Sequence, residues 1–256
     1  MKLDETWQPL LAELSRWRQA GRTADFWLRD DDAVAPTHAL DRLLAVTRKH
    51  AVPVALAVIP KPTGEALARR LAGEEHVRVV VHGWSHENHA PPGEKKQELG
   101  RHRPPEIVLG ELSSGLSRLR KLHAGRFAPL LVPPWNRIDA GLLPHLAGAG
   151  FAALSVFGDP TPGPIRMINS NVDIMDWRGT RGCRDHATLV AEITAQLGEA
   201  FVRQDDPVGL LTHHLVHDEA AWAFLDSLFE VTSTHRACRW RSVGDLLASD
   251  GGSGSA

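Results

Sequence analysis

The chain has 256 residues, of which 43% are hydrophobic and 23% are charged, and its formal net charge is −2 at pH 7. That length supports one large α/β domain or two small ones. The near-neutral charge gives no indication of a nucleic-acid partner or of an anionic membrane surface, and two cysteines are too few for a disulfide framework.

The N-terminal segment has the pattern of an amphipathic helix. Trp7, Leu10, Leu14 and Trp17 recur at helical spacing, with charged residues between them. A secretory signal would instead have an apolar core after a basic start, and no apolar run in the sequence reaches the length of a membrane span. We therefore expect a cytoplasmic protein without an integral membrane segment.

Apolar strands alternate with helices along the rest of the chain. After the N-terminal helix, the expected strands are 24–28, 52–59, 77–81, 127–132, 151–157, a ragged strand within 165–174, and 208–212. The expected helices are 37–50, 63–72, 105–123, 140–149, 186–203, 218–231 and 242–247. Seven buried strands with helices between them predict a parallel sheet, and seven such units favour a closed or nearly closed barrel over an open sheet.

The chain contains no internal Gly/Ser-rich linker and no repeat. We therefore expect one catalytic α/β domain over residues 1–250, including the N-terminal helix. The last residues, 251–256, read GGSGSA and are expected to form a flexible tail.

Ionisable residues and tryptophans gather where the expected strands end, while the strands themselves are apolar. His82 and His86 follow the third strand, and on a helical turn their spacing places two rings side by side. In α/β barrels the chemistry lies at the C-terminal ends of the strands. The pattern therefore predicts a metal or catalytic site there. The other groups at strand ends are Asp30, Asp31, Asp32, Pro134, Trp135, Asp173, Asp176, Trp177 and His213.

Two histidines and one carboxylate form a common binding site for a divalent metal that keeps open coordination positions. A metal in such a site lowers the pKa of a bound water, and hydrolysis then requires a base and an acid. Adjacent aspartates suit the ligand and the base, because successive side chains near a strand end point in different directions. A histidine from another strand suits the acid.

The combined pattern resembles the five motifs of the polysaccharide deacetylases, the NodB-homology carbohydrate esterases. In chain order the motifs are Asp31-Asp32, His82-x-x-x-His86, Pro133-Pro134-Trp135, Asp173-x-x-Asp176-Trp177 and Leu211-x-His213. They span most of the chain. The resemblance implies an α/β fold of the distorted (β/α)7 barrel type and metal-dependent removal of an N- or O-acetyl group from a sugar.

The resemblance also implies a role for each motif residue. Asp31 matches the catalytic base and His213 the catalytic acid, while Asp32, His82 and His86 match the ligands of one divalent metal. Zinc is the expected metal, and cobalt, nickel, manganese and iron are compatible with the same ligands. The remaining residues are expected to contact substrate (Pro134, Trp135, Trp177 and Leu211) or to orient site groups (Arg29, Asp30, Asp173 and Asp176).

Two positions depart from the usual second and third motifs. Gly83 follows the first histidine, where Ser or Thr is usual, and Val132 stands where an arginine usually pairs with the base. Arg29 or Arg137 would have to supply that charge.

The first motif also departs from the usual pattern. Arg29 and Asp30 precede the paired aspartates, where Thr-Phe is usual. This leaves the register among Asp30, Asp31 and Asp32 open by one residue.

These observations lead to three functional hypotheses. The first is a metal-dependent hydrolase that removes an acetyl or similar acyl group from an N-acetylated sugar or a soluble glycan precursor. The second is a metal-dependent amidase or deformylase that acts on a small non-carbohydrate amide; Val132 and the long loop at 90–103 leave room for it. The third is a non-catalytic sugar-binding domain, and the presence of every expected catalytic and ligand residue argues against it.

Overall fold

The computed structural model describes residues 5–203 and 207–249, so the tail expected at 251–256 lies outside the described residues. The chain divides into two compact units. The first unit comprises Met1–Asp30, Thr37–Val54 and Ser170–Ser242, and the second comprises Asp31–Pro36, Ala55–Asn169 and Val243–Ala256. The single catalytic domain expected over residues 1–250 stays a prediction.

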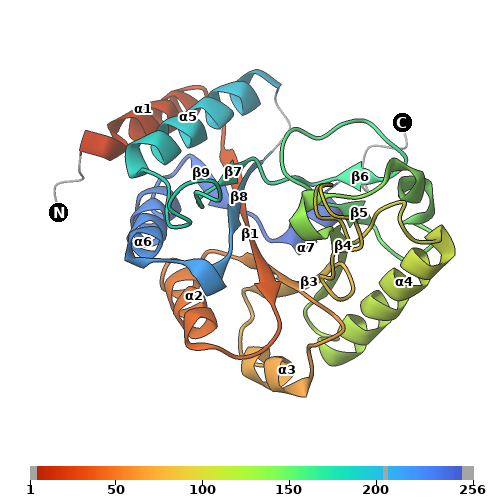
Figure 1. Cartoon of the computed structure of the whole chain (residues 1–256). Helices are drawn as coiled ribbons and strands as arrows, with labels where there is room; N and C mark the ends of the chain where they lie inside the picture. Colours follow the sequence, from red (N-terminus) through yellow and green to blue (C-terminus); the bar gives the residue numbers. More distant parts are fainter. Residues whose placement is uncertain (1–4, 204–206, 250–256) are drawn as a thin grey trace. The chain divides into compact units, whose positions relative to one another are not determined.

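The first unit contains parallel strands with helices beside them (Figure 1). Strand β1 (Ala24–Ala33) pairs with β8 in the register Leu28↔Leu210 and with β9 in the register Ala24↔Cys238, and β7 pairs with β8. The other elements of this unit are η1 (Glu5–Trp7), α1 (Gln8–Gln19), α2 (His38–Lys49), β7 (Val172–Asp173), α5 (His186–Arg203), β8 (Val208–Thr212), η4 (His214–Val216), α6 (Glu219–Ser233) and β9 (Cys238–Trp240).

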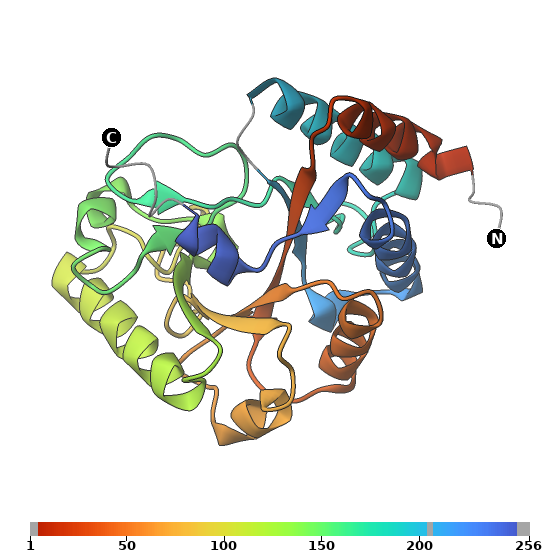
Figure 2. The same ribbon diagram turned by 180° about the vertical axis from the view of Figure 1, so that it is seen from behind.

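Helix caps and aromatic contacts explain why these helices form where they do. Thr37 caps α2 by accepting a hydrogen bond from the amide of Leu40 at 3.0 Å. Helices α1 and α5 lie side by side in both ribbon views (Figures 1 and 2), and the Trp17 ring packs edge-on against Phe201 with ring centroids 5.2 Å apart. The amphipathic N-terminal helix therefore buries its apolar face within this unit.

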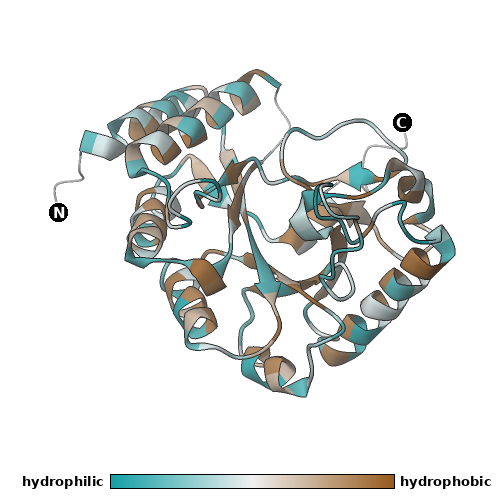
Figure 3. Cartoon of the chain, viewed as in Figure 1, coloured by the Kyte–Doolittle hydropathy of each residue, from teal (hydrophilic) through white to brown (hydrophobic). Residues whose placement is uncertain are grey.

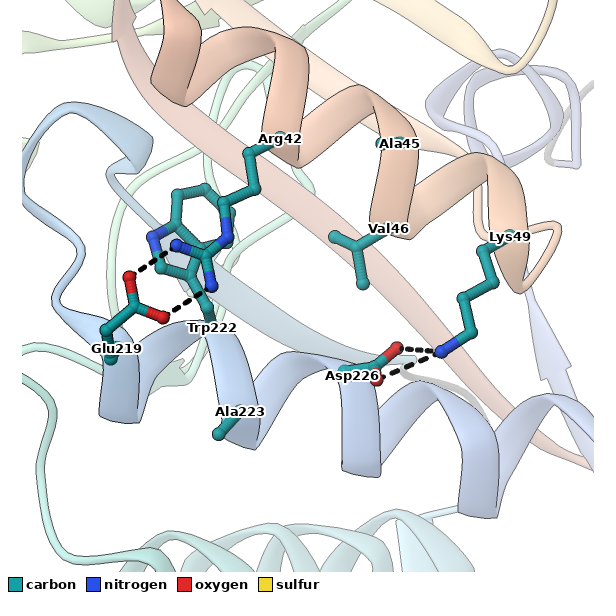
Figure 4. Close-up of a pocket in the computed structure, with 8 residues that line it drawn as sticks. All are labelled: Arg42, Ala45, Val46, Lys49, Glu219, Trp222, Ala223 and Asp226. Carbon is teal, nitrogen blue, oxygen red and sulfur yellow. Dashed lines mark hydrogen bonds and ion pairs between the residues drawn. The ribbon is translucent and has the colours of Figure 1, made fainter.

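A groove runs between helices α2 and α6 (Figure 4). Arg42 forms a bidentate ion pair with Glu219 at 2.5 and 2.7 Å and lies over the ring of Trp222, and Lys49 pairs with Asp226 at 2.7 Å. Each charged group along the groove thus already has a partner. The groove is therefore a contact between two helices whose charged side chains pair with each other.

The second unit contains the end of β1 and a run of parallel strands in the order β6-β5-β4-β3-β2. The amide of Ile59 donates to the carbonyl of Ala33 at 3.0 Å, and β3 pairs with β4 in the register His82↔Val132. The elements of this unit are β2 (Val54–Val58), α3 (Glu65–Leu71), β3 (Val77–His82), α4 (Pro105–Leu122), β4 (Phe127–Val132), η2 (Pro134–Asn136), η3 (Ala140–His145), β5 (Ala153–Leu154), β6 (Arg166–Met167) and α7 (Val243–Ala248).

Hydrophobic side chains fill the interior of both units. Val77, Val79, Val80 and Val81 of β3 are completely buried, as expected for a strand covered on both faces. Figure 3 shows that β1 instead changes from hydrophobic to hydrophilic residues toward its arrowhead. Among the described residues, no helix has the length and apolarity that a membrane span requires.

The structure differs from the sequence prediction in several elements, among them the strand expected at 151–157, of which β5 keeps two residues. β1 continues through the aspartates to Ala33, although its apolar pattern ends at Leu28; Arg29, Asp30 and Asp31 are buried there, while Asp32 is partly exposed. The ragged sixth strand is two short strands, β6 and β7, and β9 was not predicted because it has only three residues. The segment 140–149 forms the 3-10 turn η3, which contains Pro144, a residue without an amide proton for a continuing α-helix.

Candidate metal centre

Asp32, His82 and His86 come together in the second unit. Nε2 of His82 lies 3.0 Å, and Nε2 of His86 3.3 Å, from the same oxygen, Oδ1 of Asp32. One ligand atom from each residue lies within 4.8 Å of the others. Two ligands about 2.1 Å from one ion, at an angle of about 90–110°, are about 3.0–3.4 Å apart. The observed separations therefore fit the coordination of one divalent ion.

Strand pairing fixes the ring of His82. His82 ends β3 and stands opposite Val132 of β4, whose carbonyl accepts a hydrogen bond from Nδ1 at 3.0 Å. A ring that donates from Nδ1 keeps the lone pair of Nε2 for a metal. Because His82 is only 2% exposed, its neighbours rather than water determine its orientation.

The two histidine rings differ in the direction of their pKa shifts. Burial acts to lower the pKa of His82, but the hydrogen bond with Asp32 and the charges of Asp31 and Asp32 outweigh it and raise that pKa. Burial and the neighbouring His82 lower the pKa of His86. A divalent ion would replace the proton on His82, because its positive charge would interact with the same carboxylates, those of Asp31 and Asp32.

Unusual backbone conformations concentrate at this cluster. Positive φ angles occur at Asp32 (73°), His86 (61°), Trp135 (56°) and Asn136 (55°), which are four of the six such non-glycine residues in the described part of the chain. Such conformations cost about 1–3 kcal/mol each and tend to gather at functional sites. At Asp32 the positive φ interrupts the alternation of the strand, so the direction of this side chain could not be predicted from its position in β1.

The other predicted residues in the second unit lie at the ends of β1 and β4. Asp31 is 2% exposed and directly precedes Asp32 in β1. The ring of Trp135 follows β4 and lies 4.4 Å from that of His86, while Pro134 before it is buried. Trp135 is thus both a neighbour of a candidate ligand and partly open to solvent.

Arg29 and Arg137 were the two arginines considered as replacements for the one missing at Val132. Arg137 donates from Nη1 to the carbonyl of Lys96 at 2.8 Å, which ties it to the loop at 90–103. Arg29 is fully buried in the first unit. Its positive charge acts to lower the pKa of Asp173, although burial has the larger effect and raises it.

Asp30 belongs to a buried hydrogen-bonded cluster in the first unit. Its Oδ2 accepts from Thr212 Oγ1 at 2.7 Å and from the amide of His214 at 3.0 Å, and its Oδ1 lies 2.5 Å from Nδ1 of His214. Burial acts to raise the pKa of Asp30, but the charge and hydrogen bond of His214 outweigh it and lower that pKa. From the sequence, His214 was open between a substrate contact and a capping or solvent-facing ring; in the structure it is buried and is the principal partner of Asp30.

His213 follows β8 in the first unit and contacts Trp177. The two rings meet edge-on with centroids 4.7 Å apart, and the indole nitrogen of Trp177 donates to Asp173 Oδ2 at 2.7 Å. The amide of His213 lies 3.3 Å from Nε2 of His217. Burial lowers the pKa of His217 to about 4. A neutral His217 is the form that can accept this hydrogen bond. Leu211, two residues before His213, is buried.

Asp176 holds a turn. Its carboxylate accepts hydrogen bonds from the amides of Gly179 and Thr180, both at 2.9 Å, and these bonds lower its pKa.

The predicted site residues are divided between the two units. The second unit contains Asp31, Asp32, His82, His86, Pro134 and Trp135, and the first contains Arg29, Asp30, Asp173, Asp176, Trp177, Leu211 and His213.

Glu98 is a neighbour of the candidate ligands that the sequence analysis missed. It is fully buried, and a Cβ atom at Gly83 would overlap its carboxylate oxygen Oε2 and lie 2.7 Å from Cδ of Pro134. Gly83 also has a φ of +57°, which side chains disfavour. The departure from Ser or Thr at this position was the one available signal in the sequence.

We expect the substitution Gly83→Ala to lower the free energy of unfolding by at least about 2 kcal/mol, because it combines left-handed strain with overpacking. Gly21→Ala is the matched control, since Gly21 has a similar φ of +66° but nothing within 4 Å of the place that a Cβ atom would take. The difference between the two variants in urea unfolding should be about 1–3 kcal/mol. Equal losses would show that the space at Gly83 is not filled.

Comparison with known proteins gives matches to solved structures. No family model and no curated protein matches the sequence. A protein from Mycobacterium smegmatis, described as a candidate polysaccharide deacetylase, is similar with a TM-score of 0.68 at 16% identity, over 89% of this chain and 90% of its own. A family 4 acetyl xylan esterase from Clostridium thermocellum, in complex with a cobalt ion, has a TM-score of 0.54 at 15% identity, over 88% of this chain and 90% of its own.

At these identities the similarity shows the fold. It confirms the expected α/β fold of the distorted (β/α)7 barrel type and, at the level of structure, the resemblance to the polysaccharide deacetylases. A mutant of BA3943, described as a CE4 family pseudoenzyme with restored enzymatic activity, is also similar, with a TM-score of 0.58 at 13% identity over 88% of this chain and 68% of that one. The fold alone therefore does not establish catalysis.

Proposed function

We propose that this protein is a metal-dependent hydrolase that removes an acetyl group from an N-acetylated sugar or a soluble glycan precursor. The observation that carries the proposal is the convergence of Asp32, His82 and His86 on one point, in a chain whose fold is similar to that of polysaccharide deacetylases.

Asp32, His82 and His86 would hold one divalent metal. Zinc is the first expectation, and the cobalt ion in the structurally similar acetyl xylan esterase supports a divalent transition metal. When bound, the metal would lower the pKa of a water molecule and polarise the substrate carbonyl. The mixed nitrogen and oxygen ligands, the tautomer fixed at His82 and the contact of both rings with one carboxylate oxygen fit that use.

Asp31 and His213 carry the proton transfers in this proposal. Asp31 accepts a proton from the attacking water as the C–O bond forms, and His213 donates a proton to the amine as the C–N bond breaks, so that acetate and a free amino sugar leave. The choice of Asp31 is supported by its place beside Asp32 in β1. The choice of His213 rests on the sequence resemblance.

Tryptophans would bind the substrate. Trp135 follows Pro134 at the end of β4 and is only half-buried, and its aromatic ring is a group that suits stacking against a sugar ring. Trp177, 43% exposed, and Leu211 are assigned to the acetyl group on the sequence resemblance. The choice of a soluble substrate follows from the cytoplasmic location, which stays a prediction.

The proposal is tested by acetate release. Protein stripped of metal and reloaded with Zn²⁺ or Co²⁺ is incubated with N-acetylglucosamine oligomers, an acetylated sugar nucleotide and a panel of small acetamides and formamides. We expect acetate from the sugars only with the metal-loaded wild type, and none from a His82→Ala variant. Hydrolysis confined to the small amides would replace the sugar substrate with the amidase alternative. A wild-type protein that holds one metal ion and hydrolyses none of these substrates would contradict the hydrolase.

A further inference from the structure

The loop at 90–103 carries a buried carboxylate, Glu98, for which the proposed reaction has no use. Its Oε1 accepts hydrogen bonds from the amide of Ser85 at 2.7 Å and from the hydroxyl of Ser85 at 3.0 Å, and both of its oxygens lie 3.3 Å from the amide of Trp84. Trp84 and Ser85 lie between the candidate ligands His82 and His86. Glu98 thus holds the backbone that joins them.

Gly83 provides the space for this carboxylate. Any side chain at position 83 would overlap Oε2 of Glu98, and the amide of Gly83 is held by the carbonyl of Val132 at 3.1 Å. The motif that this segment resembles usually has Ser or Thr at the same position. Here a carboxylate from the loop that follows this segment occupies the volume that a side chain at that position would take.

The backbone on both sides of Glu98 is anchored within the second unit. The carbonyl of Gln97 accepts a hydrogen bond from the amide of His89 at 3.0 Å, and the carbonyl of Leu99 accepts one from the amide of Asp139 at 2.8 Å. The backbone at Glu98 is therefore held in place on both sides. Its carboxylate can in turn hold the segment between His82 and His86 in place.

The surroundings of Glu98 are compatible with a cation on the adjoining histidines. Backbone amides and a hydroxyl hold its carboxylate, and Arg103 lies beside the same residue: its Nη2 donates to the backbone carbonyl of Glu98 at 3.3 Å and its Nη1 pairs with Glu111 at 2.8 Å. A buried negative charge next to the segment that carries both histidines would favour a divalent cation bound to them.

We propose that Glu98 is a positioning residue for the metal-binding histidines, and this inference rests on the proposed metal site. By holding the amides of Trp84 and Ser85, its carboxylate maintains the turn in which His86 has a φ of 61° and both rings face Asp32. Gly83 and Glu98 act as a pair, since the first provides the space that the second fills.

The test is the affinity of the full chain for Co²⁺, measured by competition with a fluorescent chelator, together with the visible absorption spectrum of the bound ion. We expect Glu98→Ala to raise the Kd by about 10–100-fold and to alter the Co²⁺ spectrum, as loss of an orienting partner does. Glu98→Gln should fall between this variant and wild type, because its amide oxygen still accepts from Ser85. The matched control is Glu94→Ala on the same loop, where the exposed carboxylate of Glu94 lies 3.5 Å from His102; its Kd should stay within about 3-fold of wild type.

Circular dichroism and melting of the metal-free proteins separate positioning from stability. A Glu98→Ala variant that is folded and binds Co²⁺ with the wild-type Kd would overturn the inference and leave the metal site standing. If Glu98→Ala does not fold, Glu98→Gln decides: a wild-type Kd and spectrum would overturn the inference, and weaker binding with an altered spectrum would support it. A wild-type protein that binds no Co²⁺ would overturn the proposed function, and the inference with it.

Discussion

An Asp32→Asn variant is expected to lose its bound metal and, with it, its hydrolytic activity. Oδ1 of Asp32 lies within 3.3 Å of both histidine nitrogens, so the substitution removes the one negative charge that the two candidate ligand rings share. Metal affinity should fall by more than about 100-fold, the upper end of what loss of an outer partner of a metal site costs. Asparagine tolerates a positive φ as aspartate does, so the backbone at φ 73° should be retained.

Metal content by plasma mass spectrometry and acetate release measure this effect, and Asp31→Asn is the matched control. Asp31 is adjacent in the chain and also buried. If it is the base, its variant should keep one metal ion per chain and lose activity. Loss of metal from Asp31→Asn but not from Asp32→Asn would contradict the assignment and move the motif by one residue.

The second large effect is expected on stability, from Asp30→Ala. Asp30 and His214 are buried and 2.5 Å apart, so removing the carboxylate deletes the hydrogen bonds that it accepts from Nδ1 and the amide of His214 and the shorter of the two that Thr212 Oγ1 donates. Breaking a buried pair from one side costs about 3–5 kcal/mol. Urea unfolding of the metal-free protein should show a loss of this size, separate from any effect of metal on stability.

Asp25→Ala is the control for Asp30→Ala. Asp25 lies on the same strand and pairs with Arg239 at 2.7 Å and with Arg241 at 2.9 Å, but its side chain is 21% exposed and that of Arg239 is 57% exposed, so water can replace these partners and the loss should be about 1 kcal/mol. The double variant Asp30→Ala/His214→Ala should lose less than the sum of the two single variants, because the residues share one interaction. A similar, small loss for Asp30→Ala and Asp25→Ala would contradict the structural role of Asp30.

The parts of the fold that depend on periodicity could be predicted from the sequence. The helix at His186–Arg203 and the strand at Val208–Thr212 were predicted with the bounds that the structure shows, because a helical repeat and a short apolar run define them. The end of β1 could not be predicted in this way. Its polar residues are buried through partners that lie far away in the sequence, such as His214 for Asp30.

The candidate site was predicted in its residue types but not in its geometry. The sequence proposed Asp32 with His82 and His86 as ligands, and the structure brings these three together. The choice of Asp32 rested on the resemblance, which left the register among the three aspartates open by one residue, because a positive φ at Asp32 leaves no periodic signature. Glu98 was missed for a similar reason: it lies in an irregular loop, and only its folded position shows that Gly83 makes room for it.

The hydrogen bond from His82 to the carbonyl of Val132 has a consequence for how this site tolerates mutation. The acceptor is a main-chain atom, so every residue type at position 132 supplies it as long as β3 and β4 stay paired. Valine can therefore stand where the resembled motif has arginine without any loss in ring orientation. The side chain at position 132 can therefore change in evolution while the strand pairing keeps the tautomer of the first histidine.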